Sequence, residues 1–504
     1  MTFLFKKILL AALLICLAAP AASAVDFKIK GRWIFLGDYG QSGRFTGGNG
    51  AVGYNNRLGY DDFEMTSRMR IQLNAVASEA LSGTLHLEIG KFRWGQTSSG
   101  AALGADGTNS VKVKHSYLDW TMPKTDLKIR MGIQTLNLPS FTTDSNILGA
   151  DVAGIVTGYK INQNISASAF WIRPYNDNYV GGGIKDNHQN FLDNMDLFGA
   201  TLPMTVTGLN VTPWVMVGMI GPNTIRVGDN YFCGSAPIYY TRNLTALSMG
   251  MKKEALTSYG TAFWTGLTGE VTALDPFHIA WDFNYGSTQY DDASASRRGW
   301  LASLVLEYKM NWGIPGLVAW YTSGDDDDTS NGSERMPYTN VDEIGYGSFG
   351  SYAFFGGRPS TDRNSMIGHS MAGTWGVGAR TTKISLLENL DSSIRINLIG
   401  GTNDPNLIKK LHGKTNIWMS PNNYSNENST GMENLYMTTK DTALECGITN
   451  TYMIYENLKL GIDASYMKLF LDKSADVWGN SRMNGKSDNV KDSWNVSLYL
   501  AYNF

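Results

Sequence analysis

The chain has 504 residues, a mean hydropathy of −0.20 and a formal net charge of −3. Its 42 basic and 45 acidic residues nearly balance, which argues against nucleic acid as a partner because nucleic-acid binding needs a basic surface. With 55 glycines, 25 tyrosines and 14 tryptophans against 14 prolines, the composition suits many turns and aromatic residues at membrane–water interfaces. One large barrel therefore fits better than several soluble domains.

The first 24 residues have the organisation of a secretory signal peptide. Lys6 and Lys7 precede an apolar run over 8–19, and Ala22-Ser23-Ala24 supplies small residues for cleavage. The alternative, a membrane anchor, would need an apolar run of about 20 residues. We therefore expect export, removal of residues 1–24, and a single domain over residues 25–504.

A two-residue alternation of apolar and polar side chains is the dominant pattern of the chain, and it predicts strands. In the stretch 63–75, Phe63, Met65 and Met69 share one face, while Arg68 and Arg70 lie on the other. The pattern predicts strands near 27–38, 62–77, 82–93, 111–122, 127–138, 153–161, 165–174, 196–206, 209–219, 261–273, 277–287, 298–310, 314–323, 373–388, 392–401, 441–455, 458–470 and 493–504.

The connections between these strands alternate between short turns and long polar loops, the longest near 220–260, 324–372 and 402–440. Eight short turns and nine long loops place both ends of the domain on the short-turn side. Outer-membrane barrels have this asymmetry, whereas a soluble sandwich has no reason for it. We therefore expect an all-β fold, a transmembrane antiparallel β-barrel with 18 strands, with 16 as the alternative if the short stretches over 153–174 are not both strands.

The last strand, SWNVSLYLAYNF at 493–504, ends on an aromatic residue. Backbone groups in the hydrocarbon region must be paired within the protein, so this strand should close against the first one. Phe504 would then join a periplasmic aromatic girdle. The alternating end also resembles the C-terminal signal read by the barrel-assembly machinery, which we expect as a partner of Phe504.

A barrel of 16–18 strands encloses an aqueous channel, so its inward positions should be polar. A guanidinium facing lipid at the midplane would cost about 2–4 kcal/mol, which favours an inward orientation for charged residues of the strands. A basic wall would raise the local anion concentration; the alternative is a solvated lumen whose charges balance. The predicted pore-lining residues are Arg32, Arg68, Arg70, Glu88, Lys112, Lys114, Arg130, Arg380 and Arg395.

The segment SFTTDSNILGAD, residues 140–151, is the candidate for a loop that folds inward and narrows the channel. Asp144 and Asp151 would supply the negative side of this constriction. The alternative is an ordinary external loop, since spacing does not reveal how a loop folds.

The acidic run Asp325–Asp328 invites a calcium interpretation, because hard cations favour clustered carboxylates. Its spacing fails the EF-hand pattern, with Thr329 at the third position and Tyr338 where a bidentate Glu belongs. We expect a solvated external loop, no metal and no cofactor.

An enzyme within the barrel would need a nucleophile, a base and an orienting group held together. The spacing of the six histidines assembles no such set, so no enzymatic activity is expected. Cys233 and Cys446 fit no metal or redox motif. The histidines are His86, His115, His188, His278, His369 and His412.

The sequence resembles the outer-membrane homotrimeric porins of sulfate-reducing bacteria, which are related in architecture to general diffusion porins. The resemblance rests on MTSRMRIQLNAVASEALSGTLHLEIGKFRWG at 65–95, LKIRMGIQTLNLPSF at 127–141, AWYTSGDDDD at 319–328 and the aromatic end. It implies a homotrimer in the bacterial outer membrane, surrounded by lipid and lipopolysaccharide.

The resemblance also implies a water-filled channel for passive diffusion of small hydrophilic solutes and ions, and the basic wall suggests an anion bias. The alternative is a substrate-selective channel for oxyanions, carboxylates or sugars. An outer-membrane barrel enzyme is a less favoured third possibility.

Overall fold

The computed structural model describes the chain in eleven segments, which contain all of the expected strands. The segment 1–24, expected to be a signal peptide, and Cys233 lie outside them. The described residues are 25–41, 61–104, 111–176, 194–221, 224, 242–246, 258–328, 330–339, 371–411, 437–472 and 493–504.

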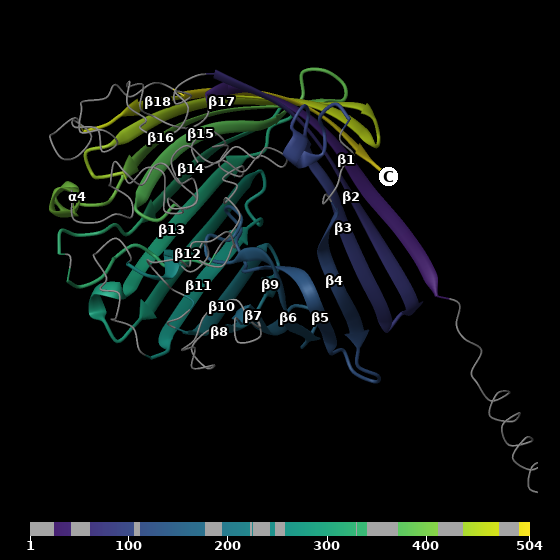
Figure 1. Cartoon of the computed structure of the whole chain (residues 1–504), viewed down its shortest axis with the longest axis horizontal. Coiled ribbons are helices and arrows are strands. Elements are labelled where there is room, and N and C mark those ends of the chain that lie inside the picture. The colour runs from purple at the N-terminus through teal and green to yellow at the C-terminus, as the bar shows by residue number, and fades with distance from the viewer. Residues whose placement is uncertain are drawn as a thin grey trace, which may run out of the picture.

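The described segments are built almost wholly of strands (Figure 1). The strands are β1 (Asp26–Gln41), β2 (Asp61–Ser78), β3 (Leu81–Arg93), β4 (Val111–Thr121), β5 (Lys128–Asn137), β6 (Gly149–Lys160), β7 (Ser166–Asn176), β8 (Asn194–Thr201), β9 (Met204–Val206), β10 (Leu209–Ile220), β11 (Gly260–Val271), β12 (Phe277–Gln289), β13 (Arg297–Tyr308), β14 (Ile314–Thr322), β15 (Thr374–Ile384), β16 (Leu390–Gly401), β17 (Thr442–Tyr455), β18 (Leu458–Phe470) and β19 (Ser493–Asn503). The helical turns are η1 (Thr97–Ser99), η4 (Arg242–Leu244), η6 (Ala293–Ala295) and α4 (Pro405–Leu411). Among the described helices, none is long and apolar enough to cross a membrane.

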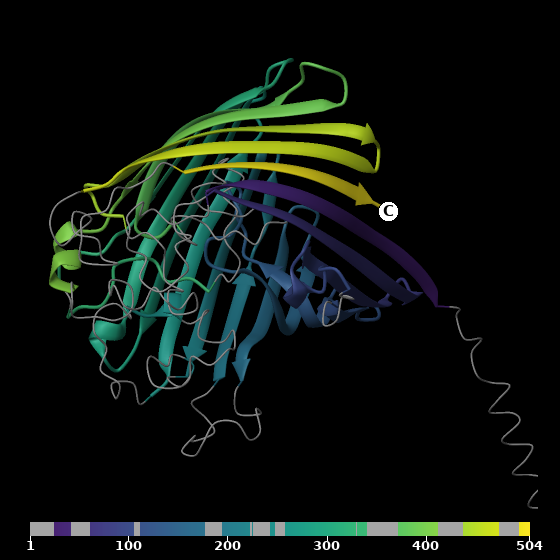
Figure 2. The ribbon, with the colours of Figure 1, turned by 45° about the horizontal axis from the view of Figure 1, so that its top comes forward.

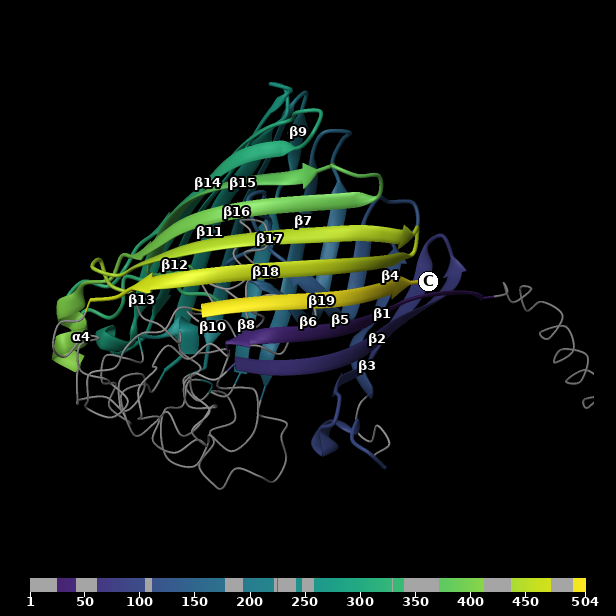
Figure 3. The ribbon, with the colours of Figure 1, turned by 90° about the horizontal axis from the view of Figure 1, so that it is seen from above.

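Each strand pairs antiparallel with its neighbours, and the sheet closes on itself because β1 pairs with both β2 and β19. The purple first strands and the yellow last strands lie side by side in Figures 2 and 3. β8 and β9 both pair with β10, so they form one strand interrupted at Leu202 and Pro203, where proline lacks an amide proton for the ladder. The described part of the chain is therefore a closed 18-stranded barrel, and the prediction of 18 rather than 16 strands is confirmed.

The two doubtful stretches over 153–174 are both strands, β6 and β7, and β6 begins four residues before the predicted start. Short turns such as 207–208 and 456–457 join strands at the end of the barrel where β1 begins and β19 ends. The strand ends that the long connections join, such as the end of β16 beside α4, lie at the other end of the barrel (Figure 3). The predicted asymmetry in the lengths of the connections at the two ends is therefore present.

The alternation of side chains between the two faces follows the prediction on β1 and β2. Phe27, Trp33 and Phe63 are exposed on the outer face, whereas Leu36 and Arg68 are buried on the inner face. Large apolar side chains that face lipid need no cover, which explains why so many remain exposed in a well-paired sheet.

The inner face differs from the prediction on the wall from β7 to β18. Inward residues there are apolar and buried, including Ile172, Met216, Trp264 and Trp320, and they form one continuous cluster. The expectation of a polar inner face is therefore wrong for much of this wall. The physical reason is that loop segments fold into the barrel and cover these side chains, so they never face water.

The seam between β1 and β19 is finished by Phe504. Its backbone amide donates to the Gly31 carbonyl (3.0 Å), and the Gly31 amide donates to the Phe504 carbonyl (2.8 Å). The Phe504 ring lies close over Gly31 and stacks near Trp33 and Tyr502. A Cβ atom on Gly31 would lie 2.4 Å from Cζ of Phe504. Only glycine at this position leaves room for the Phe504 ring.

We predict that Gly31→Val destabilises the closed seam by roughly 1–3 kcal/mol, the usual cost of overpacking. The valine side chain would displace the Phe504 ring. The measurement is the midpoint of the heat-induced mobility shift of the folded barrel on SDS gels.

The matched control is Gly83→Val, because a Cβ atom at Gly83 meets nothing within 4 Å. Equal midpoints for the two variants would show that the ring does not depend on Gly31.

Candidate functional site

The connection between β5 and β6, residues 138–148, lies inside the barrel. Leu138, Ile147 and Leu148 are almost fully buried and belong to the inner apolar cluster. Their partners include Trp264 and Met216 of the barrel wall. The predicted inward folding of this segment is therefore present, with apolar side chains holding it against the β10–β11 wall.

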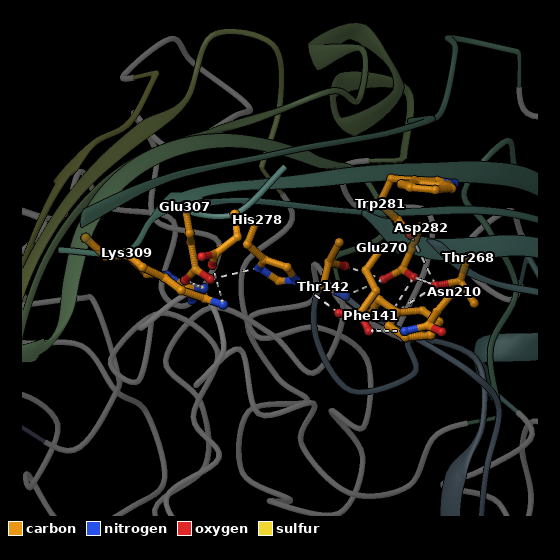
Figure 4. Close-up of polar contacts among 12 residues, drawn as sticks. Phe141, Thr142, Asn210, Thr268, Glu270, His278, Trp281, Asp282, Glu307 and Lys309 are labelled. Carbon is orange, nitrogen blue, oxygen red and sulfur yellow. Dashed lines mark hydrogen bonds and ion pairs between the residues drawn. The ribbon is translucent and has the colours of Figure 1, made fainter. Parts of the chain in front are cut away.

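Asp282 on the inner face of β12 fixes this loop through its carboxylate (Figure 4). It accepts hydrogen bonds from Ser140 Oγ (2.6 Å), the Phe141 amide (3.0 Å) and the Thr142 amide (3.1 Å). The hydroxyl groups of Thr142 and Thr268 also donate to it. Hydrogen bonds to a charged acceptor are stronger than neutral ones, so one carboxylate holds the loop to the wall.

Other loop segments pack over the far side of this loop. The Thr339 amide and hydroxyl both donate to the Ile147 carbonyl (2.8 Å each). Trp264 Nε1 donates to the Pro337 carbonyl (2.9 Å), and Arg297 donates to the carbonyl of Arg335 (2.8 Å). The loop is thus clamped between the wall and the connection that follows β14.

Asp144 is an exposed side chain within an otherwise buried stretch, because Thr142, Thr143 and Ser145 to Leu148 are all buried. Its carboxyl group therefore projects from the inward loop, and its role in a constriction stays a prediction. Partial burial raises the pKa of Asp144 above its ordinary value of 3.8.

The predicted basic wall on β2 and β3 is a compact ion cluster rather than a row of free cations. Arg70 lies 2.6 Å from the Glu88 carboxylate and donates a hydrogen bond to it through Nε, and Arg68 approaches it to 3.8 Å. Arg32, opposite Arg70 in the register, has no ion pair among the described residues. Arg32 is therefore the cation of this group whose charge is least compensated.

A row of polar side chains crosses the inner faces of β10 to β15 near the short-turn end. Asn210 donates to Glu270 (2.7 Å), and His278 lies between Glu270 (3.0 Å) and Glu307 (3.1 Å), as Figure 4 shows. Arg380 donates to the other oxygen of Glu307 (2.7 Å). The predicted pore residue Arg380 of β15 thus faces inward but is neutralised by Glu307 of β13, two strands away.

Two more predicted residues are paired in the same way. Arg395 bonds Thr449 (2.9 Å) and Asp463 (3.3 Å) on the inner face. Arg130 bonds Asp119 (2.7 Å) and lies over the Tyr117 ring. The sequence allowed either a basic wall or a lumen whose charges balance, and Arg130 and Arg395 fit the balanced lumen.

The remaining predicted residues lie at the loop end of β4 and β6. Lys112 is exposed opposite Glu88. Lys114 lies in a register shift of β4 and forms an ion pair with Asp151. Asp151 is in β6 rather than in the loop, because β6 begins at Gly149. Its carboxylate contacts Lys114 and His115 of β4, and its part in a constriction stays a prediction.

The acidic run after β14 is engaged with its own chain. Asp325 accepts from the Ser333 hydroxyl (2.5 Å) and the Glu334 amide, Asp327 pairs with Lys410 (2.6 Å), and Asp328 accepts from Ser330. Across the described segments, no group of three or more potential metal ligands gathers.

Asp282, Glu270 and Glu307 were not among the residues expected from the sequence. Each is a lone acid at an inward position of a strand whose outward positions are apolar, as Asp282 is between Trp281 and Phe283. That pattern could have marked them, since an isolated acid in a membrane strand needs a partner inside the barrel. Their partners, however, come from distant parts of the chain.

Comparison with known proteins supports the fold. No family model and no curated protein matches the sequence. Among solved structures, the chain is similar to the outer membrane protein OprD from Pseudomonas aeruginosa, with a TM-score of 0.51 and 11% identity over 97% of this chain and 95% of that one. It is also similar to OccAB3 from Acinetobacter baumannii, with a TM-score of 0.52 and 8% identity over 95% of this chain and 99% of that one. At these identities the likeness establishes the architecture.

We predict that Asp282→Ala releases the loop from the wall and raises the single-channel conductance. Each hydrogen bond to the carboxylate is worth about 1.5–3 kcal/mol, and the variant loses several together. Single-channel recording in planar bilayers measures the effect.

Asn284→Ala is the matched control, since Asn284 is two residues away on the same inner face and its amide oxygen has no partner among the described residues. Conductance that stays equal in Asp282→Ala and wild type would show that the loop does not limit the channel.

We predict a pH step in ion selectivity that originates at Asp144. Because the pKa of Asp144 is raised, its carboxyl group becomes neutral at a higher pH than a free aspartate, and the lumen loses a negative charge there. Anion preference should therefore rise on acidification while ordinary carboxylates are still ionised. The reversal potential in a KCl gradient, measured over a pH series, reports this shift.

Asp144→Asn should have the acid-form selectivity at every pH and no such step. A step that persists in this variant would assign the titration to another group.

Proposed function

We propose that the protein is an outer-membrane channel for passive diffusion of small hydrophilic solutes and ions. The observation that carries this proposal is the loop 138–148, which Asp282 fixes across the interior of a closed barrel. A barrel that merely anchored its external loops would gain nothing from a charged residue, Asp144, projecting from such a loop. A narrowed lumen with charged walls is the architecture that selects solutes by size and charge.

The charge distribution supports a weak rather than a strong selectivity. The arginines at 130, 380 and 395 are each held by a carboxylate of the inner face, and Arg68 and Arg70 share the carboxylate of Glu88. Paired charges contribute little net field at a distance, because the fields of the two partners cancel. Arg32, which lies near Arg70 and Lys459, gives the channel its anion bias.

The second candidate is a channel selective for oxyanions or carboxylates. Arg32 favours it, because a guanidinium without a carboxylate partner is a site for a bidentate anion. In this case one solute would block ion flow in a saturable way. A sugar channel has less support, since Tyr499 is a single aromatic residue on β19 and the inward Trp264 and Trp320 are buried rather than open to a solute.

The proposed setting is the outer membrane of a bacterium, reached after removal of a signal peptide. Further proposals are a homotrimer, lipopolysaccharide and lipid around the outer face, and the barrel-assembly machinery acting on the strand that ends at Phe504. An enzymatic role is not proposed.

The proposal is tested by reconstituting the purified protein in planar bilayers. Conductance in steps of three with weak selectivity is the expected result for a trimeric diffusion channel. Saturable block by one anion at micromolar concentration would favour the selective channel. Folded protein that inserts without any conductance would refute both.

We predict that Arg32→Gln shifts the reversal potential in a KCl gradient toward cation preference, because it removes from the lumen a cation that has no ion pair among the described residues. The shift should be larger than that of Arg130→Gln, whose positive charge is already neutralised by Asp119.

Lys468→Gln serves as the external control, since Lys468 lies exposed on the outward face of β18. If Arg32→Gln and Lys468→Gln give the same reversal potential, Arg32 does not set the selectivity.

A further inference from the structure

Two histidines of neighbouring strands turn the same ring nitrogen toward each other. His86 of β3 and His115 of β4 are opposite in the register, and His86 also lies opposite Gln72 on the inner face of β2. Their Nδ1 atoms are 3.0 Å apart. The ring centroids are 4.8 Å apart, and the ring planes are inclined by 58°.

The two ring centres are closer together than they would be in a straight hydrogen bond between the nitrogens. A straight N–H···N bond of this length would hold the ring centres about 5.3 Å apart, which is longer than the observed 4.8 Å. Two imidazoles bound at right angles to one metal, each about 2.0–2.1 Å from it, have nitrogens about 2.9 Å and ring centres about 4.5 Å apart. The pair therefore has the spacing of two adjacent ligands of one ion.

The second nitrogen of His115 is held in the way that metal-binding histidines are. His115 Nε2 lies 2.9 Å from Asp151 Oδ1, and the Thr135 hydroxyl donates to the same oxygen (2.6 Å). A carboxylate only accepts, so it fixes the proton on Nε2 and leaves a lone pair on Nδ1. A carboxylate behind a ligating histidine is the usual supporting arrangement at metal centres.

The two cationic side chains nearest to the histidine pair, Arg70 and Lys114, are each paired with a carboxylate, which reduces their repulsion of a bound metal ion. Arg70 is engaged by Glu88, and Lys114 is engaged by Asp151. The charges around the pair are thus largely compensated, as on the rest of the inner wall.

We propose that His86 and His115 form a two-imidazole site for a divalent transition-metal ion, with water completing the coordination. Imidazole nitrogens suit copper, nickel and zinc, and a pair of adjacent ligands at right angles fits the tetragonal geometry of Cu²⁺ best. Binding replaces the proton shared between the two Nδ1 atoms, which moves to His86 Nε2 or to solvent. Acidification should therefore weaken binding, as protons compete for the same lone pairs.

The test uses the purified full chain in detergent and Cu²⁺ as the probe. Calorimetric titration should show one more Cu²⁺ per chain in the wild type than in His86→Gln or His115→Gln. Electron paramagnetic resonance of the bound Cu²⁺ should show coupling to two nitrogens. Asp151→Asn should keep the stoichiometry and weaken binding by about 10–100-fold, the usual effect of removing a supporting carboxylate.

His278→Gln is the matched control, because His278 also faces the lumen but both of its nitrogens are engaged by Glu270 and Glu307. It should bind Cu²⁺ as the wild type does. Equal stoichiometry and affinity in the wild type, His86→Gln and His115→Gln would overturn the proposal, as would a wild type that binds no Cu²⁺. These readouts do not involve ion conduction, so they stand or fall separately from the channel proposal.

Discussion

The need to pair every backbone amide and carbonyl within the protein determines the structure as a whole. In hydrocarbon an unpaired peptide group costs several kcal/mol, and strands meet this requirement only in a closed ring. The ladder from β1 through β19 and back to β1 satisfies it, and Phe504 extends the last pair of strands by two hydrogen bonds to Gly31. Once the ring is closed, one face of each strand meets lipid and the other encloses a space, and every functional feature lies in that space.

A related constraint applies to the inner wall, where a charge that is partly shielded from water needs a partner. Charged side chains on the inner wall are joined into small neutral groups, such as Arg70 with Glu88 and Arg395 with Asp463. Asp282 follows this rule in another way, since its partners are backbone amides and hydroxyl groups of the loop 138–148. Carboxylates of the inner wall therefore have two roles: some neutralise arginines of the wall, and Asp282 holds the inner loop in place.

The two-residue alternation and the lengths of the connections predict most of the fold, but they predict only part of the candidate site. Alternation such as Phe63 against Arg68 reveals strands and their inward faces, and turn lengths reveal which ends share a side of the membrane. Ion pairs join residues of different strands, so the sequence named Arg380 as inward but could not supply Glu307 as its partner. Asp144 lies in the inward loop that the sequence marked, whereas Asp151 lies in β6, whose start depends on pairing with β5.

Thr339 donates two hydrogen bonds to the Ile147 carbonyl and so joins the connection that follows β14 to the loop 138–148 inside the barrel. Pro337 of the same segment accepts a hydrogen bond from Trp264 of the wall. A substitution within residues 335–339 would therefore act on the backbone of the inner loop as well as on its own segment. Two connections that lie far apart in the sequence are thus expected to vary together.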